Sequence, residues 1–553
     1  MIQVSVVSDF NADLVARYLS AGRTPPLCQA VASPFGQAYQ ALKVEPPGGR
    51  ESMVLVWTRP EGVVASWQRH LDGERVALGE LLDGVDLFAS AVLAHSERCR
   101  FLLVAGWVPA RLSRGLGIRD WSADGDAFRL AQMNLRLAER VAGSRRVFML
   151  DAQRWIDAAR PARDGKYWYS IKSPFTEGVC AAAAHDVRSA VRNVLGENRK
   201  LIVVDLDNTL WGGVVGDDGW RNLRIGGHDP VGEAFGDFQR ALLALSRRGI
   251  VLAISSKNDE ATALEAIDQH PEMILRRHHF AAWRIDWSDK ARNIESLAKE
   301  LNLGLQSAVF IDDSPSERGR VREALDQVLV PDWPDDPSRF ADALRQMDCF
   351  DQSAMTEEDA ARAAMYVTER HRREASAEST SEEDWLDTLG VRVDLAPVTE
   401  GNVKRVAQLL NKTNQMNLRT RRLAEDEFSD WLRGDGRGAL ALTVRDRFGD
   451  IGLTGVLTWQ EIGRELEIVD FILSCRAMGR RVEPLMLALA VETARAGGKD
   501  HVLAPLHRTE RNGPCLEFWR ASGCEEPEPN LFLWQAGVAY PRPGAIDVID
   551  GRG

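Results

Sequence analysis

Two aspartates one residue apart follow a short apolar run near the middle of the chain. Leu201–Val204 has the composition of a strand buried on both faces of a parallel sheet, and Asp205 and Asp207 come directly after it. Open α/β sheets bind their ligands outside the carboxyl ends of such strands. One carboxylate can attack a phosphoryl group while the other moves a proton, and a hard cation such as Mg2+ can screen both charges. The pair therefore predicts phosphoryl chemistry.

Three further segments carry groups that suit the same chemistry. A second apolar run ends in Ser255 and Ser256, a third ends in Asp312 and Asp313, and Lys290 stands between the two runs at a predicted helix start. The spacing fits successive βα units, so all these groups can meet at one edge of one sheet. A single acidic pair after a strand more often caps the next helix. The four motifs in this order favour a shared site.

Together these motifs resemble the haloacid dehalogenase (HAD) phosphotransferase superfamily, and the wider sequence resembles its FkbH-like branch. The match is carried by residues 205–219, 256–259, 310–318, 413–422, 446–452 and 474–483. The resemblance implies a Mg2+-dependent enzyme that removes phosphate from a glycolysis-derived phosphoglyceryl group, such as that of 1,3-bisphosphoglycerate. It also implies that glyceryl is loaded as a thioester onto an acyl carrier protein in polyketide-type biosynthesis.

The HAD-like motifs suggest a role for each polar residue. Asp205 is expected to be the nucleophile that forms an aspartyl phosphate, and Asp207 the general acid and then base. We expect Mg2+ to be held by Asp205, the backbone carbonyl of Asp207 and Asp312, with Asp313 as a direct or outer ligand. The phosphoryl oxygens would be bound by Ser256 and Lys290. Ser255 is the alternative to Ser256, because the strand register is open.

Length and composition are those of a large protein with several domains. The chain has 553 residues and a formal net charge of -12, which argues against a nucleic-acid-binding protein. It lacks an apolar stretch of membrane-spanning length, and residues 1–10 read as a first strand instead of a signal peptide. Its seven cysteines contain no CxxC pair, so neither a disulfide framework nor a zinc site is expected. These features predict a cytoplasmic protein.

The pattern of elements predicts an α/β chain of three domains. Residues 1–195 are expected to form an α/β domain that resembles a degenerate SGNH-like esterase, residues 196–370 a HAD-like core with a parallel sheet, and residues 371–553 a linker helix and a GNAT-like α+β acyltransferase domain. Ser8 stands where the esterase nucleophile would be, but convincing Asp and His partners are missing from the sequence. A scaffold or docking role is expected for this domain. The charged run 355–385 is predicted to be a helix that grades into a linker.

The C-terminal part contains a strand, an arginine-rich loop and a predicted helix in succession. Residues 439–459 read as two strands around a turn at 448–452, residues 465–475 as another strand, and residues 476–498 as a helix. The R-x-x-G loop resembles the pyrophosphate loop of GNAT acyltransferases. Arg481 departs from the small residue usual there, so the phosphopantetheine arm of a carrier protein is the expected guest in place of coenzyme A.

Cys475 is predicted to lie at the end of that strand, directly before the arginine loop. A thiol at a helix N-terminus beside Arg476 would favour the nucleophilic thiolate, and an acyl group could rest on it as a thioester. The alternative is a small buried core residue, which is the commoner fate of a lone cysteine.

A polar segment upstream of Cys475 offers amides and positive charge. Asn414, Gln415 and Asn417 could position an acyl group or bind the pantetheine arm, although a solvated turn would also be polar. Two arginine clusters are candidate docking sites for an acidic carrier protein: Arg419, Arg421 and Arg422, and Arg476, Arg480 and Arg481.

Two functions remain open from the sequence. The chain is either a bifunctional enzyme that dephosphorylates a three-carbon substrate and loads a carrier protein through Cys475, or a plain Mg2+-dependent small-molecule phosphatase whose flanking domains bind partners.

Overall fold

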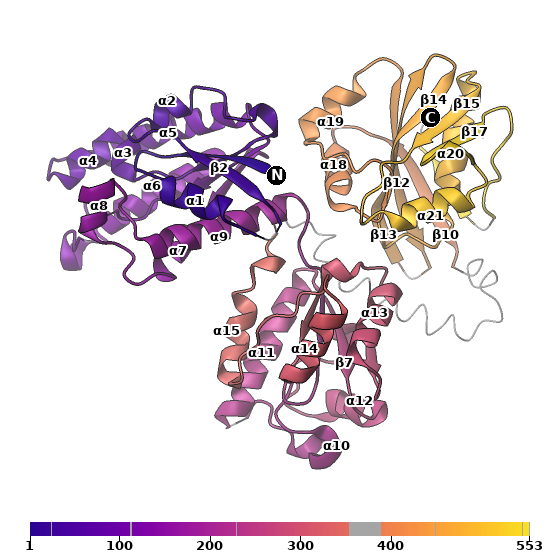
Figure 1. Ribbon diagram of the computed structural model, residues 1–553, viewed down its shortest axis with the longest axis horizontal. Helices are drawn as coiled ribbons and strands as arrows, with labels where there is room; N and C mark the ends of the chain where they lie inside the picture. Colours follow the sequence, from indigo (N-terminus) through magenta and orange to yellow (C-terminus); the bar gives the residue numbers. More distant parts are fainter. Residues whose placement is uncertain are drawn as a thin grey trace. The chain divides into compact units, whose positions relative to one another are not determined.

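The computed structural model divides the chain into two compact units, Met1–Val194 and Leu195–Gly553. Figure 1 labels the helices and strands along the chain. The structure describes all residues except Thr24, Arg111, Leu112, His228, 353–365, 367–388, Phe448, Ala545, Arg552 and Gly553. The predicted charged helix at 355–385 therefore lies outside the described residues, apart from Tyr366. Among the helices that are described, none combines the length and the apolar character needed to cross a bilayer.

The N-terminal unit is built on a five-stranded parallel sheet with strand order β2-β1-β3-β4-β5. The strands are β1 (Ile2–Val7), β2 (Cys28–Ala32), β3 (Met53–Val56), β4 (Phe101–Ala105) and β5 (Val147–Leu150). The helices are α1 (Asp13–Ser20), α2 (Ala38–Ala41), α3 (Pro60–Val63), α4 (Ala65–Leu71), α5 (Leu78–Ser96), α6 (Asp126–Val141), α7 (Gln153–Asp157), α8 (Gly165–Ile171) and α9 (Glu177–Val194). Because strand side chains alternate, Val54 and Val56 share one face and pack in the core built by α5 and α6.

The second unit begins with a four-stranded parallel sheet of order β8-β7-β6-β9. Its strands are β6 (Leu201–Val204), β7 (Val251–Ser256), β8 (Phe280–Ile285) and β9 (Ala308–Ile311). The accompanying helices are α10 (Val215–Asp218), α11 (Pro230–Arg247), α12 (Glu260–Gln269), α13 (Lys290–Glu300), α14 (Pro315–Ala324) and α15 (Phe340–Arg345).

Helices cover both faces of this sheet, which explains the continuous apolar run of β6. Ile202 and Val204 belong to a core cluster with α11, α12 and α15, whereas Leu201 and Val203 belong to a cluster with α13 and α14. Each face of the strand is thus buried against a different helical layer. The side chains of β6 are therefore all used in packing, and a site at the sheet edge must be formed by the polar residues that follow the strands.

The rest of the second unit is a larger, mainly antiparallel sheet of order β16-β17-β15-β14-β13-β12-β10-β18, with β11 paired to β14. The strands are β10 (Val391–Pro397), β11 (Met416–Asn417), β12 (Arg437–Asp446), β13 (Gly449–Ile462), β14 (Glu465–Leu473), β15 (His501–Pro505), β16 (Glu525–Glu528), β17 (Leu531–Gln535) and β18 (Ile546–Asp550). Its helices are α18 (Val403–Lys412), α19 (Glu425–Leu432), α20 (Val482–Ala496) and α21 (Gly513–Ala521). The predicted fold class, a parallel α/β core followed by an α+β part, is confirmed.

Two predicted boundaries in this part are wrong. Gly449 to Gly452 lie within β13 instead of forming a turn, because the strand pairs with β12 down to Gly449 through two register shifts. The predicted helix at 476–498 begins only at Val482, because Arg481 has a left-handed backbone with φ of 61° that cannot continue a right-handed helix.

Candidate functional site

Three carboxylates gather at the carboxyl ends of β6 and β9. Asp205 follows β6 and Asp312 and Asp313 follow β9, and the register pairs Val204 with Ile311 immediately before them. Oxygens of the three carboxylates lie within 4.8 Å of one another. Asp205 and Asp312 are 6% and 0% exposed, so the cluster is shielded from bulk water.

Lys290 places its charge between two of these carboxylates. It is the first residue of α13, whose N-terminus is capped by Asp289 accepting from the backbone N–H groups of the next turn. The Lys290 Nζ lies 2.6 Å from Asp312 Oδ2 and 3.0 Å from Asp205 Oδ1. Burial alone would lower the pKa of Lys290, but the two carboxylates outweigh it and the pKa is raised, so the side chain is a cation.

The site carries more negative than positive charge. Burial, reinforced by the charge of Asp205, raises the pKa of Asp312 to about 6, and Lys290 opposes the shift. The same two causes raise the pKa of Asp313. Asp205 Oδ1 is buried and accepts no hydrogen bond from any described residue, although Lys290 Nζ is close to it in an ion pair. Buried carboxylate oxygens in excess over cations form the donor set that Mg2+ prefers, so these residues fit a divalent cation.

Asp207 is held in place by three donors. Trp211 Nε1 and the backbone N–H of Val215 donate to its Oδ1 at 2.9 and 3.1 Å, and Asn258 Nδ2 donates to its Oδ2 at 3.0 Å. Asn208, the residue after Asp207, has a positive φ of 52°. The loop thus turns sharply after Asp207, and the three hydrogen bonds fix the position of the Asp207 carboxylate.

The two candidate serines differ in their connection to this network. Asn258 Nδ2 also donates to Ser256 Oγ at 3.1 Å, so Ser256 is joined through Asn258 to Asp207. Ser255 is buried, and its Oγ has no hydrogen-bond partner among the described residues. Consecutive strand residues point to opposite faces, and the hydrogen bonds favour Ser256 as the site residue.

Thr209 and Arg318 support the acidic pair, and neither had a role assigned from the sequence. Thr209 Oγ1 donates to Asp313 Oδ1 at 3.1 Å and accepts from the Asp313 backbone N–H at 3.0 Å. Arg318 Nη1 donates to the backbone carbonyls of Asp312 and Asp313 at 2.8 and 2.7 Å. The D-x-D-x-T spacing contained the signal for Thr209, whereas the role of Arg318 depends on where α14 places it.

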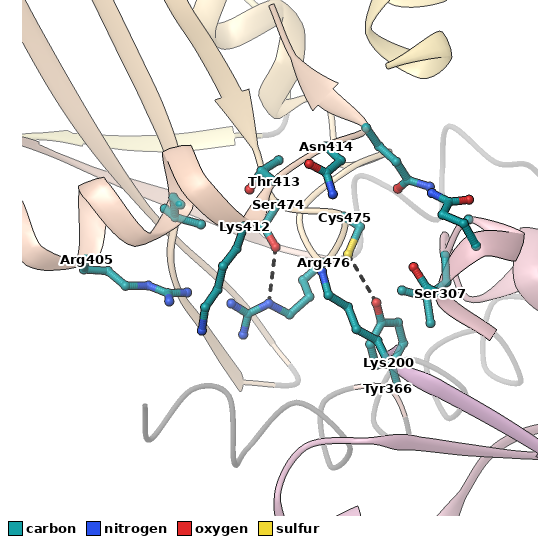
Figure 2. A pocket seen from close by; sticks show the side chains of 15 residues that line it. Lys200, Ser307, Tyr366, Arg405, Lys412, Thr413, Asn414, Ser474, Cys475 and Arg476 are labelled. Atoms are coloured by element: carbon teal, nitrogen blue, oxygen red, sulfur yellow. Dashed lines mark hydrogen bonds between the residues drawn. The ribbon is translucent and has the colours of Figure 1, made fainter. Parts of the chain in front are cut away.

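Cys475 lines a separate cavity of about 80 Å³ in the second unit (Figure 2). Tyr366 Oη and Cys475 Sγ form a hydrogen bond of 3.2 Å. The described lining includes four cationic side chains, Lys200, Arg405, Lys412 and Arg476, and none that is acidic. This composition suits an anionic guest.

The predicted setting of Cys475 at a helix N-terminus is wrong. The strand β14 ends at Leu473 and α20 begins at Val482, so six residues separate the thiol from the helix. Any activation of the thiol must come from the cavity itself, where Tyr366 contacts it and Arg476 follows it in the chain.

The three amides of the upstream segment fall in different places. Asn414 and Gln415 line the Cys475 cavity. Asn417 is fully buried in β11, where its Nδ2 donates to the Thr413 carbonyl and its Oδ1 accepts from the Thr420 N–H. The predicted role of Asn417 in positioning an acyl group is therefore wrong, because both ends of its amide hold the backbone.

Most of the predicted docking arginines are bound within the fold. Arg419 pairs with Glu467 at 2.7 Å, and Arg421 makes a two-point ion pair with the buried Asp470. Arg480 is 6% exposed. Arg422 donates to the Leu410 carbonyl and to Asn414. Arg419, Arg421 and Arg422 therefore do not form the open basic patch expected from the sequence, and Arg480 is buried.

Comparison with known proteins shows the fold of part of this chain. No family model matches it, and neither does any curated protein sequence. The crystal structure of the N-terminal part of the protein BF1531 from Bacteroides fragilis, which contains a phosphatase domain complexed with Mg, shares 24% identity and a TM-score of 0.57 over 64% of this chain and 95% of that one. The spermidine/spermine N-acetyltransferase SpeG from Vibrio cholerae matches 26% of this chain and 94% of its own at 13% identity with a TM-score of 0.20. A domain from Methanocaldococcus jannaschii matches 26% of this chain and 96% of its own at 14% identity with a TM-score of 0.21. The matched 64% of the chain shares its fold with the Bacteroides fragilis structure.

Proposed function

We propose that this chain is a Mg2+-dependent HAD-type phosphatase and glyceryltransferase, which dephosphorylates a phosphoglyceryl group and transfers glyceryl to an acyl carrier protein. The observation that carries the phosphatase part is the cluster of Asp205, Asp312 and Asp313, the first two buried and the third half-buried, with Lys290 beside two of them. The Bacteroides fragilis structure that shares the fold contains a phosphatase domain complexed with Mg, which supports the choice of cation.

The residues at the sheet edge divide the phosphatase reaction between them. An oxygen of Asp205 attacks phosphorus, the bond to the leaving oxygen breaks, and Asp207 donates a proton to that oxygen. Asp207 then takes a proton from the water that hydrolyses the aspartyl phosphate, which releases inorganic phosphate and restores Asp205. Lys290 and Ser256 bind the phosphoryl oxygens. Bound by Asp205, Asp312, Asp313 and the Asp207 carbonyl, Mg2+ would neutralise charge on the phosphoryl group.

The Cys475 cavity is the proposed acyl-transfer site. The sulfur of Cys475 attacks the acyl carbon of an acyl phosphate, the carbon–oxygen bond breaks and phosphate leaves. The thiol of a carrier protein's phosphopantetheine arm then takes the acyl group and restores Cys475. Four cationic side chains in the lining support this assignment, because both the acyl phosphate and the arm carry phosphate.

The two sites adjoin opposite ends of the same strands. Lys200 and Ser307, which line the Cys475 cavity, immediately precede β6 and β9, whereas the aspartates follow them. Four residues of strand span roughly 13 Å. A three-carbon substrate cannot reach across that length, so we propose that phosphate removal and acyl transfer are separate events at separate sites.

Intact-mass analysis tests the proposal. The enzyme, a candidate carrier protein and 1,3-bisphosphoglycerate are incubated with Mg2+, and phosphate release is followed in parallel. We expect a glyceryl adduct on the wild-type enzyme and then on the carrier. The acyl-transfer part is wrong if phosphate is released and neither protein gains mass, a result that would favour the plain phosphatase.

The phosphatase part is tested by Asp205→Asn, with Asp217→Asn as a matched control on the exposed helix α10. Loss of the nucleophile should lower phosphate release from a small phosphate monoester by on the order of a thousandfold or more, and the control should be unchanged. Wild-type release by Asp205→Asn would remove Asp205 from the mechanism.

A further inference from the structure

The N-terminal unit contains a cavity of about 260 Å³ that has no part in the function proposed above. The strand order β2-β1-β3-β4-β5 means that the chain leaves β1 first toward β2 and then crosses to β3 on the other side. Parallel sheets bind ligands outside the carboxyl ends of the strands where this reversal occurs. Asp9 follows β1 and Arg59, which lines the cavity, follows β3. The cavity therefore lies where such a fold places a ligand.

Arg59 is fixed in position at the cavity wall. Its Nε donates to Asp9 Oδ2 at 2.8 Å, its backbone N–H donates to Asp9 Oδ1 at 2.7 Å, and its guanidinium carbon lies 4.2 Å from the ring centre of Trp168. Its Nη1 is 3.5 Å from Glu61. Its Nη2 makes no hydrogen bond with any residue that the structure describes. A guanidinium held by a buried carboxylate and an aromatic face presents that remaining edge with little loss of conformational freedom.

Arg163 brings a second cation, and no carboxylate among the described residues forms an ion pair with it. Its Nε donates to the Pro109 carbonyl at 2.7 Å. Burial lowers the pKa of Arg163, which reflects the cost of removing its charge from water. Asp164 also lines the cavity, but its carboxylate caps α8 by accepting from the Lys166 N–H. An anion bound beside Arg163 would offset the cost of its desolvation.

We propose that this cavity binds a small oxyanion, a carboxylate or a phosphate monoester, between Arg163 and the Nη2 edge of Arg59. Trp168 and Tyr169 provide an aromatic wall for the carbon part of the ligand. The site is non-hydrolytic. Ser8 is fully buried with its Oγ accepting from the Phe10 N–H at 3.1 Å, so it presents no nucleophile to a ligand.

The test follows Trp168 by fluorine NMR in the full chain labelled with 5-fluorotryptophan, its resonance assigned from Trp168→Phe. Inorganic phosphate and D-glycerate are titrated separately. Because the probe sits in this cavity, binding at the Asp205 site does not report on it. We expect a saturable shift of the Trp168 resonance with at least one anion, and the responding anion tells phosphate from carboxylate recognition.

Arg163→Gln should raise the dissociation constant at least about tenfold, because it removes charge-assisted hydrogen bonds. The dissociation constant of Arg163→Lys should lie between those of Arg163→Gln and the wild type. Arg50→Gln, a change at an exposed position, should bind as the wild type does. A Trp168 resonance that neither anion moves saturably overturns the proposal. So does an unchanged affinity in both Arg163 variants. If Arg163→Gln does not fold, the affinity of Arg163→Lys is compared with that of Arg50→Gln: weaker binding by Arg163→Lys supports the proposal, and equal binding overturns it.

Discussion

Lys290 Nζ lies 2.6 Å from Asp312 Oδ2, and the lysine and the aspartate are 4% and 0% exposed. The lysine comes from the start of α13 and the aspartate from the end of β9, so the pair ties a helix to the sheet edge at the centre of the proposed site. Asp205 shares the same ammonium group at 3.0 Å. The buried Lys290 ammonium group thus balances part of the charge of these carboxylates.

Replacing this lysine should destabilise the metal-free protein. Lys290→Met leaves the buried carboxylates without their cation, which should cost about 3 kcal/mol of unfolding free energy. Saturating Mg2+ should restore part of the loss, because the metal takes over the compensation of charge. Urea unfolding with and without Mg2+ measures both effects. Lys299→Met, at an exposed position of the same helix, is the control and should differ little from the wild type. Equal stability of the two variants would mean that Lys290 does not compensate the carboxylates.

Mg2+ should stabilise the fold more at neutral than at acidic pH. Burial, with the added charge of Asp205, raises the pKa of Asp312 from 3.8 to about 6. The folded protein therefore keeps a proton that the unfolded chain loses, so this group's contribution to metal-free stability declines as pH rises from about 4 through about 6. Mg2+ competes with the proton on Asp312, so it should bind more tightly as the pH rises and Asp312 loses that proton. The rise in unfolding midpoint on adding Mg2+ should be larger at about pH 7.5 than at about pH 5. A rise that does not depend on pH would contradict this.

Arg421→Glu should strongly destabilise the C-terminal part, so its effect on loading would not report on docking. The new carboxylate would face Asp470, which is 0% exposed and loses its two-point partner, at a cost of about 3 kcal/mol or more. Arg433→Glu, at an exposed position of the same part, should change stability by less than about 1 kcal/mol. Thermal unfolding followed by circular dichroism compares the two. Equal midpoints would show that the Arg421 and Asp470 pair is dispensable.

The two proposed activities should be separable by mutation. Cys475→Ala should abolish the acyl adduct and leave phosphate release from a small substrate unchanged, because none of the three clustered aspartates is among the described residues that line the Cys475 cavity. Asp205→Asn should stop phosphate release from a small phosphate monoester and leave acylation of Cys475 intact, with the one phosphate that each acylation expels. Intact mass and a phosphate assay measure the two activities on the same samples, with Cys524→Ala as the control. Normal loading of carrier protein by Cys475→Ala would remove the thiol from the pathway.

The aspartate site could be predicted from the sequence because its signals are local. A four-residue apolar run buried by helices on both faces reads as a parallel strand, and the polar residues after it fall at the carboxyl edge. Asp205, Asp312 and the helix start at Lys290 follow from that rule alone. Their meeting also requires β6 and β9 to be neighbours, and the strand order β8-β7-β6-β9 provides this by a crossover from β8 to the far side of β6.

The residues around Cys475 show what the sequence could not determine. Asn417 and Arg421 look like exposed recognition residues in the sequence. In the structure Asn417 is buried, and Arg421 forms an ion pair with Asp470 of β14. Arg481 adopts a left-handed backbone that moves the helix start away from Cys475. The cavity at Cys475 and the cavity at Arg59 and Arg163 likewise arise from segments far apart in the chain. Alternation and periodicity along the sequence determine which residues are buried, but the partner of a polar side chain is chosen by long-range packing, so only the tertiary structure decides it.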